Sequence, residues 1–162
     1  MESITEIFRI GHGPSSSHTM APRRAAETFR AQNPDAFSYR VTLYGSLAAT
    51  GKGHMTDRAI VQALAPRTVD ILWEPLRDLP LHPNGMRFEA LDGEQAVQAA
   101  WNVYSPGGGA ILGEDEAGQP DGEKLVYDLD NMRDILKHCT QHGMAFWEYV
   151  ESREGPQSWD YL

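Results

Sequence analysis

The chain has 162 residues, of which 41% are hydrophobic and 23% charged, and its formal net charge is −9. This length and composition are typical of one globular domain with an appended tail. No apolar run is long enough to cross a bilayer, and residues 1–10 lack the apolar stretch of a secretory signal. The acidic balance disfavours binding to nucleic acid. The sequence therefore predicts a cytoplasmic protein with neither a membrane nor a nucleic acid as its partner.

Cysteine usage sets a further limit on the chemistry of the chain. Cys139 is the single cysteine, so no internal disulfide can form. An iron–sulfur cluster normally needs roughly three or four thiolate ligands. Any such cluster would therefore have to come from a partner chain or domain.

The first predicted elements are a loop and a helix. Glycine and proline at residues 11–14 break regular structure, and serines follow at residues 15–17. Ala21, Ala25 and Phe29 then recur on one side, which predicts a helix. Serine is a common N-cap residue, so both helix capping and ligand binding stay open for these serines.

A strand and a second helix are predicted next. Residues 39–47 alternate between apolar and polar, as in a half-buried strand. A polar loop with two glycines, a lysine and a histidine follows at residues 50–54. Thr56 or Asp57 can cap a helix that runs to about Leu64.

The middle of the chain predicts a hairpin. Four prolines make residues 65–84 irregular, apart from a short strand at 69–73. Residues 86–90 and 97–103 alternate on either side of an Asp-Gly turn signal, as in a β-hairpin. Residues 105–109 form a glycine-rich turn, and residues 110–112 resume the sheet.

The last part of the chain predicts helices. Residues 114–123 are acidic and rich in turn formers, which is typical of a surface connection. A helix runs from Asn131 to near Gly143, and a second one covers 144–151. The tail keeps exposed aromatic residues and reaches Leu162 without a stop signal, so we expect a partner domain beside it.

Three polar loops carry the candidate chemistry, at residues 13–19, 50–57 and 81–86. Each contains a histidine among small residues, and two of them precede predicted helices. Hydroxyls, backbone N–H groups and a lysine beside helix N-termini can hold a small anion such as a carboxylate. A histidine there can transfer protons because its pKa lies near neutrality. The alternatives are solvated histidines and a lysine that is plain surface charge.

A zinc site is a further alternative. His138 and His142 have helical spacing with Cys139 between them, which makes them candidate ligands. The sequence shows no compact pattern of four ligands, so we favour a solvated helix face.

Four motifs, taken in order, carry a resemblance to a known family. They are IGHGPSSSHT at 10–19, LYGSLAATGKGH at 43–54, HPNGM at 82–86 and YSPGGG at 104–109. Together they closely resemble the β domain of oxygen-sensitive, iron–sulfur L-serine dehydratases, from about residue 3 to 113. The chain departs from that pattern at Ala21 and Met55, where the family usually has glycine, and at His12 and Pro106, where aliphatic residues are usual.

The resemblance implies a fold and partners. The fold is α+β, with a mixed, largely antiparallel sheet and two main helices, similar to the allosteric substrate-binding domain of phosphoglycerate dehydrogenase. Residues 1–128 would form the β domain and 129–162 a helical connection towards an absent α domain. In the family that α domain binds a [4Fe-4S] cluster through three cysteines and leaves one iron open. The resemblance also implies a homodimer and L-serine as substrate.

The resemblance further implies roles for residues in converting L-serine to pyruvate and ammonia. The open iron would bind the substrate hydroxyl as a Lewis acid. His54 would take the α-proton, and His18 is the second candidate, with a binding or orienting role. Candidates for holding the carboxylate or fixing the interdomain loop are Ser15, Ser16, Ser17, Thr19 and Lys52, while His82 and Asn84 would orient the site.

This reading predicts that the chain alone is inactive and binds no metal. The main alternative is a regulatory domain that binds serine or another anion without chemistry of its own. A zinc hydrolase is the third possibility.

Overall fold

A computed structural model describes residues 3–6, 9–114 and 126–161. Contacts divide the chain into two units, a larger one of residues 11–119 and a smaller one of residues 1–10 and 120–162. Each unit has its own cluster of buried side chains. The predicted boundary at residue 128 stays a prediction, and so does the predicted surface connection, of which residues 115–123 lie outside the described part.

The larger unit has five strands and four helical segments among its described residues. In chain order they are η2 (Ser16–Met20), α1 (Ala21–Gln32), β1 (Ser38–Tyr44), α2 (Gly45–Thr50), α3 (Thr56–Leu64), β2 (Thr68–Glu74), β3 (Gly85–Leu91), β4 (Val97–Gly107) and β5 (Ala110–Gly113). The strand order is β2-β1-β3-β4-β5. Only β1 and β2 pair in parallel, and the remaining neighbours are antiparallel. The predicted α+β class with a mostly antiparallel sheet is confirmed.

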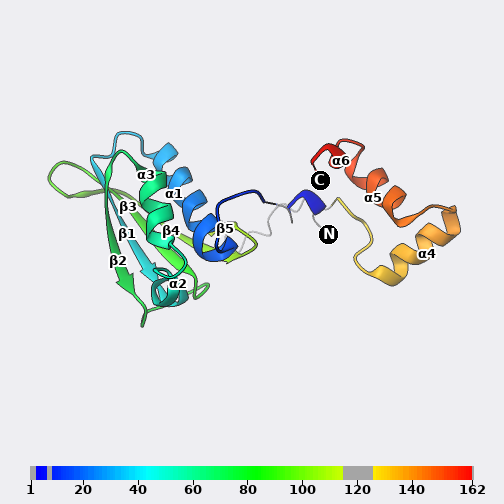
Figure 1. The fold of residues 1–162 in the computed structure, drawn as a ribbon, viewed down its shortest axis with the longest axis horizontal. Coiled ribbons are helices and arrows are strands. Elements are labelled where there is room, and N and C mark those ends of the chain that lie inside the picture. The colour runs from blue at the N-terminus through cyan, green and yellow to red at the C-terminus, as the bar shows by residue number, and fades with distance from the viewer. Residues whose placement is uncertain (1–2, 7–8, 115–125, 162) are drawn as a thin grey trace. The chain divides into compact units, whose positions relative to one another are not determined.

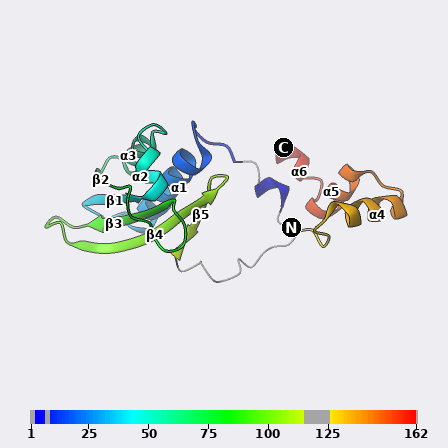
Figure 2. The same ribbon diagram turned by 90° about the horizontal axis from the view of Figure 1, so that it is seen from below.

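The sheet buries one face under helices. Figures 1 and 2 show α1 and α3 on the same side of the strands. Phe29 of α1 packs there against Phe88 of β3, with ring centroids 5.6 Å apart, and stacks on Trp101 of β4 at 6.4 Å. The other face carries charged side chains, where Arg87 lies 3.2 Å from Glu89. An antiparallel sheet can leave one face to water in this way.

The predicted hairpin is confirmed as β3 and β4. Asp92 closes its turn, because the carboxylate oxygen Oδ1 accepts hydrogen bonds from the backbone N–H groups of Glu94 and Ala96, both at 2.9 Å. The predicted short strand is confirmed as β2, and the predicted helix that ends at Leu64 is confirmed as α3.

The predicted strand over 39–47 is wrong in its last three residues. The chain leaves the strand at Gly45, which has a φ of +49° and begins α2. A side chain at Gly45 would collide with the Asp78 carboxylate and the Pro83 carbonyl. Because residues 75–84 cross the end of β1 at close range, position 45 requires a glycine.

The smaller unit is helical. It consists of η1 (Ile4–Glu6), α4 (Met132–His142), α5 (Phe146–Glu154) and α6 (Ser158–Tyr161). The predicted tail helices are confirmed, because Asn131 caps α4 by accepting from the Asp134 N–H at 3.1 Å, and Gly143 ends α4 with a φ of +64°. Within the described parts of the chain, none of the helices is long and apolar enough to span a membrane.

The start of the chain joins this smaller unit through a carboxylate. Glu154 at the end of α5 accepts from the Ile4 N–H at 2.8 Å and from the Ser3 hydroxyl at 2.6 Å. The described N-terminal residues and the end of α5 are therefore fastened together although about 150 positions separate them.

Met55 supplies the first test. It precedes α3 with a φ of +58° and is 47% exposed. A left-handed conformation costs a residue with a Cβ roughly 1–2 kcal/mol. We expect Met55→Gly to raise the free energy of unfolding by about 1 kcal/mol in urea denaturation. Met55→Ala is the matched control, because it keeps the Cβ and should bring no gain. Equal or lower stability of the glycine variant would show that the backbone here is unstrained.

Candidate functional site

The first two of the predicted loops meet beside the carboxyl end of β1. The imidazole rings of His18 and His54 lie with their centroids 4.9 Å apart and tilted by 44°. Thr19 donates a hydrogen bond to the carbonyl of His54 at 2.7 Å, and Thr56 donates one to the carbonyl of His18. Both threonines are buried. Thr19 therefore serves to hold the two loops together.

His18 is half-buried between two hydroxyls. Its Nδ1 lies 2.9 Å from the Ser17 hydroxyl and its Nε2 lies 3.3 Å from the Ser46 hydroxyl. Burial lowers the pKa of His18, the nearby His54 lowers it further, and a hydrogen bond to the Ser46 backbone raises it in part. The imidazole of His18 is consequently neutral near pH 7.

His54 has a defined tautomer. Its Nδ1 lies 3.1 Å from the backbone carbonyl of Thr50. A carbonyl can only accept, so Nδ1 carries the hydrogen, and in the neutral ring Nε2 keeps its lone pair. His54 is therefore arranged to accept a proton at Nε2.

The serines and the lysine differ in their surroundings. Ser15 caps η2, since its hydroxyl accepts from the His18 N–H at 3.1 Å. Ser16 is exposed. Lys52 is also exposed, with its Nζ 5.4 Å from the centroid of the Trp73 ring. The capping interpretation thus holds for Ser15, whereas Ser16 and Lys52 can reach a ligand.

The third loop approaches the histidine pair through Ser46. The Ser46 N–H donates to the Pro83 carbonyl at 3.2 Å, and the Ser46 hydroxyl contacts His18. Asn84 is fixed from the other side, because its Nδ2 donates to the Ser105 carbonyl at 3.2 Å. The structure therefore joins all three loops. The His82 side chain itself bonds only within the third loop, to Asn84, among the contacts that the described residues show.

His82 has the tautomer opposite to that of His54. Its Nδ1 accepts from the Asn84 N–H at 3.0 Å. In the neutral ring the hydrogen must then be on Nε2, which can donate to a ligand. His82 is thus suited to orienting an acceptor atom and poorly suited to taking a proton.

Ser46 is the site residue that sequence reasoning missed. It falls within the motif at 43–54, but it also lies in the predicted strand, and sequence reasoning assigned it no role. A glycine signal was present at Gly51, where a Cβ would lie 2.9 Å from the Trp73 ring and 3.1 Å from the Thr56 hydroxyl. A side chain at position 51 would therefore crowd β2 and the start of α3.

The chain does not supply ligands for an iron–sulfur cluster. Its one cysteine, Cys139, is buried in the smaller unit. Across the described residues, no group of three or more His, Cys, Asp or Glu side chains could hold a metal ion. An iron–sulfur cluster normally needs roughly three or four thiolates, and this chain has one cysteine.

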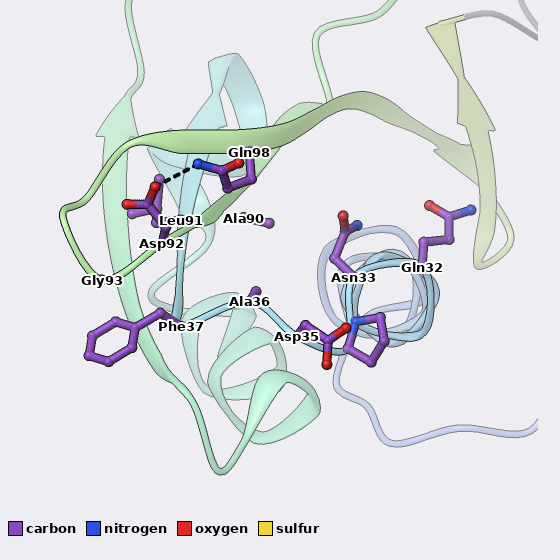
Figure 3. Close-up of a pocket in the computed structure, with 11 residues that line it drawn as sticks. Gln32, Asn33, Asp35, Ala36, Phe37, Ala90, Leu91, Asp92, Gly93 and Gln98 are labelled. Carbon is purple, nitrogen blue, oxygen red and sulfur yellow. Dashed lines mark hydrogen bonds between the residues drawn. The ribbon is translucent and has the colours of Figure 1, made fainter.

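A cavity of about 380 Å³ lies at the other end of β1. It is formed by residues 32–37 and by the β3–β4 turn, as Figure 3 shows. Its Asp92 carboxylate is already engaged, because Oδ2 accepts from Gln98 Nε2 at 2.6 Å. Hydrogen bonds, above all that from the Ala96 N–H, lower the pKa of Asp92. The cavity contains none of the predicted site residues.

Comparison with known proteins identifies the family. The profile described as serine dehydratase beta chain matches residues 3–71 and 65–116. The chain belongs to this family. The predicted resemblance is confirmed.

Curated relatives extend the comparison. L-serine dehydratase 2 of Escherichia coli strain K12 is 37% identical, over 90% of this chain and 41% of its own length. The L-serine dehydratase of Haemophilus influenzae is 33% identical, over 89% and 41%. That of Streptomyces coelicolor is 35% identical, over 88% and 41%. The chain therefore spans about two fifths of the length of these relatives.

The coupling between the two histidines can be tested by titration. We expect NMR to give His18 a pKa below its usual 6.5. His54→Gln should raise that pKa only part of the way, because burial, the larger cause, remains. His142→Gln, in the smaller unit, is the control and should leave the pKa of His18 unchanged. An unaltered pKa in His54→Gln would contradict the coupling.

The lowered pKa of His18 also predicts how stability depends on pH. The unfolded chain protonates His18 at a higher pH than the folded chain does, so the free energy of unfolding should fall as the pH drops below about 6.5.

Proposed function

We propose that this chain is the β-domain part of an L-serine dehydratase that converts L-serine to pyruvate and ammonia. In this proposal it supplies substrate-binding groups and the base, while a companion α domain or subunit carries a [4Fe-4S] cluster. The observation that carries the proposal is the contact between His18 and His54, with Nε2 of His54 free of the Thr50 bond. Membership of the serine dehydratase beta chain family supports the same assignment.

The proton step falls to His54. The α-proton of serine is weakly acidic, so its acceptor must be unprotonated and correctly oriented near neutral pH. The Thr50 carbonyl holds the ring and stabilises the imidazolium that forms, because it accepts from Nδ1–H in both states. His18 stays neutral beside it, owing to its lowered pKa, so the pair carries one positive charge rather than two.

The carboxylate and the other polar groups of serine need separate partners. We assign the carboxylate to the Ser16 hydroxyl and the Lys52 ammonium, which are exposed groups of the first two loops. Ser15, Ser17 and Thr19 keep those loops and the His18 ring in place. His82 and Asn84 orient the substrate from the third loop. In a chain with a net charge of −9, Lys52 would be important for attracting an anion.

Loss of the α-proton and of hydroxide from serine gives aminoacrylate, which tautomerises and hydrolyses to pyruvate and ammonia. The residues of this chain account for removal of the proton. Because they offer no ligand set for a cluster, departure of the hydroxide is assigned to the companion. A homodimer and a cytoplasmic location stay predictions.

The test uses the chain co-purified anaerobically with its companion. We expect His54→Ala to lower kcat for pyruvate formation by about 10²–10⁴-fold, because a positioned base contributes that much. His12→Ala is the matched control, since His12 is an exposed histidine in the first loop region, and should turn over normally.

Near-normal turnover of His54→Ala would exclude His54 as the base and direct attention to His18. Dehydration of serine by this chain alone would overturn the division of labour. Saturable serine binding without turnover in the complete assembly would instead support the regulatory alternative.

A further inference from the structure

Helix α4 carries a second pair of histidines, which the proposed function does not use. His138 and His142 lie one turn apart, with ring centroids 4.2 Å apart and planes tilted by 30°. His142 is exposed and His138 is half-buried. Side chains four residues apart on a helix point to the same side, so both imidazoles face one patch of surface.

Both rings are held in place by the protein. Nδ1 of His142 lies 2.8 Å from the His138 carbonyl, so Nδ1 carries the hydrogen and Nε2 keeps its lone pair. Metal-binding histidines commonly donate their second ring nitrogen to a backbone carbonyl in this way. The His138 ring packs edge-on against Tyr149, with centroids 5.5 Å apart and an angle of 64°. Because Tyr149 is fully buried, its position restricts the rotation of His138.

We infer that His138 and His142 form a bidentate site for a divalent late transition-metal ion, with Cu²⁺ bound more tightly than Ni²⁺ or Zn²⁺. Two histidines at this helical spacing are a known way of presenting imidazoles to one metal ion. Imidazole nitrogen suits these ions, whereas Mg²⁺ and Ca²⁺ prefer oxygen ligands. Copper leads in affinity at such sites.

Among the described residues, the pair offers two ligands. Cys139 lies between the histidines in sequence, but it is 6% exposed and packs into the core of the smaller unit. The described residues contain no group of three His, Cys, Asp and Glu ligands. Water would complete the coordination, so the ion exchanges readily, unlike one in a closed structural zinc site.

Metal binding here would stabilise the smaller unit. The buried cluster of that unit has four members, Tyr127, Ile135, Cys139 and Tyr149. An ion that bridges two consecutive turns of α4 would hold the helix in its folded form beside two of those residues. A ligand that binds only the folded state raises its stability by mass action. The unfolding temperature of the chain should therefore rise with Cu²⁺ or Ni²⁺ and fall back on chelation.

The experiment is calorimetric titration of the untagged chain with Cu²⁺ and with Ni²⁺. We expect one site in the wild-type chain. His138→Ala and His142→Ala should each weaken binding on the order of 100-fold, because the second ligand no longer binds intramolecularly. Alanine is the best helix former, so circular dichroism should show α4 preserved in both variants. Neither Cu²⁺ nor Ni²⁺ should then raise the unfolding temperature.

Two controls make the assignment specific. The double variant Thr140→His, His142→Ala keeps the number of histidines but places the second one two residues along, where the rings face apart. It should bind as weakly as the single variants. His54→Ala disrupts the other histidine pair and should keep wild-type affinity.

Unchanged affinity in either alanine variant of α4 would overturn the inference. Full affinity of the Thr140→His double variant would do the same. Loss of binding in His54→Ala alone would place the metal at the His18–His54 pair instead. None of these readouts depends on serine dehydration.

Discussion

Two buried threonine hydroxyls make the site possible. Thr19, next to His18, bonds to the carbonyl of His54, and Thr56, close to His54, bonds to the carbonyl of His18. Each loop thus holds the histidine of the other. A buried hydroxyl left without a partner costs free energy, so each of the two bonds favours the docked arrangement of the loops. The contact between the imidazoles, and the smaller part of the lowering of the His18 pKa that His54 adds to that of burial, depend on this reciprocal pairing.

Local signals predicted the elements that local interactions determine. Asp92 and Gly93 predicted the hairpin, and Asn131 and Gly143 predicted the two ends of α4. These signals are reliable because a turn or a helix cap is formed by residues close together in sequence. The parallel pairing of β1 with β2 and the start of α2 at Gly45 were not predictable in this way. The start of α2 depends on the close crossing of residues 75–84 at Gly45, and the parallel pairing depends on contacts between two strands that are well separated in sequence.

The site could be predicted as a set of loops but not as a geometry. The histidine, serine and glycine motifs indicated where the chemistry lies. They could not separate Ser15, which caps η2, from Ser16, which is exposed. Nor could they fix which nitrogen of His54 carries a hydrogen, since that depends on the Thr50 carbonyl. Ser46 escaped notice because its role arises only when η2 reaches the end of β1.

The bond between Glu154 and the first described residues makes the smaller unit discontinuous in sequence. Its parts come from both ends of the chain, and the whole of the larger unit lies between them. During synthesis the ribosome completes residues 11–114 well before it reaches Glu154. Domains generally fold as units in the order in which they emerge. The paired histidines can thus assemble co-translationally, while the N-terminal residues wait for a partner that is translated about 150 residues later.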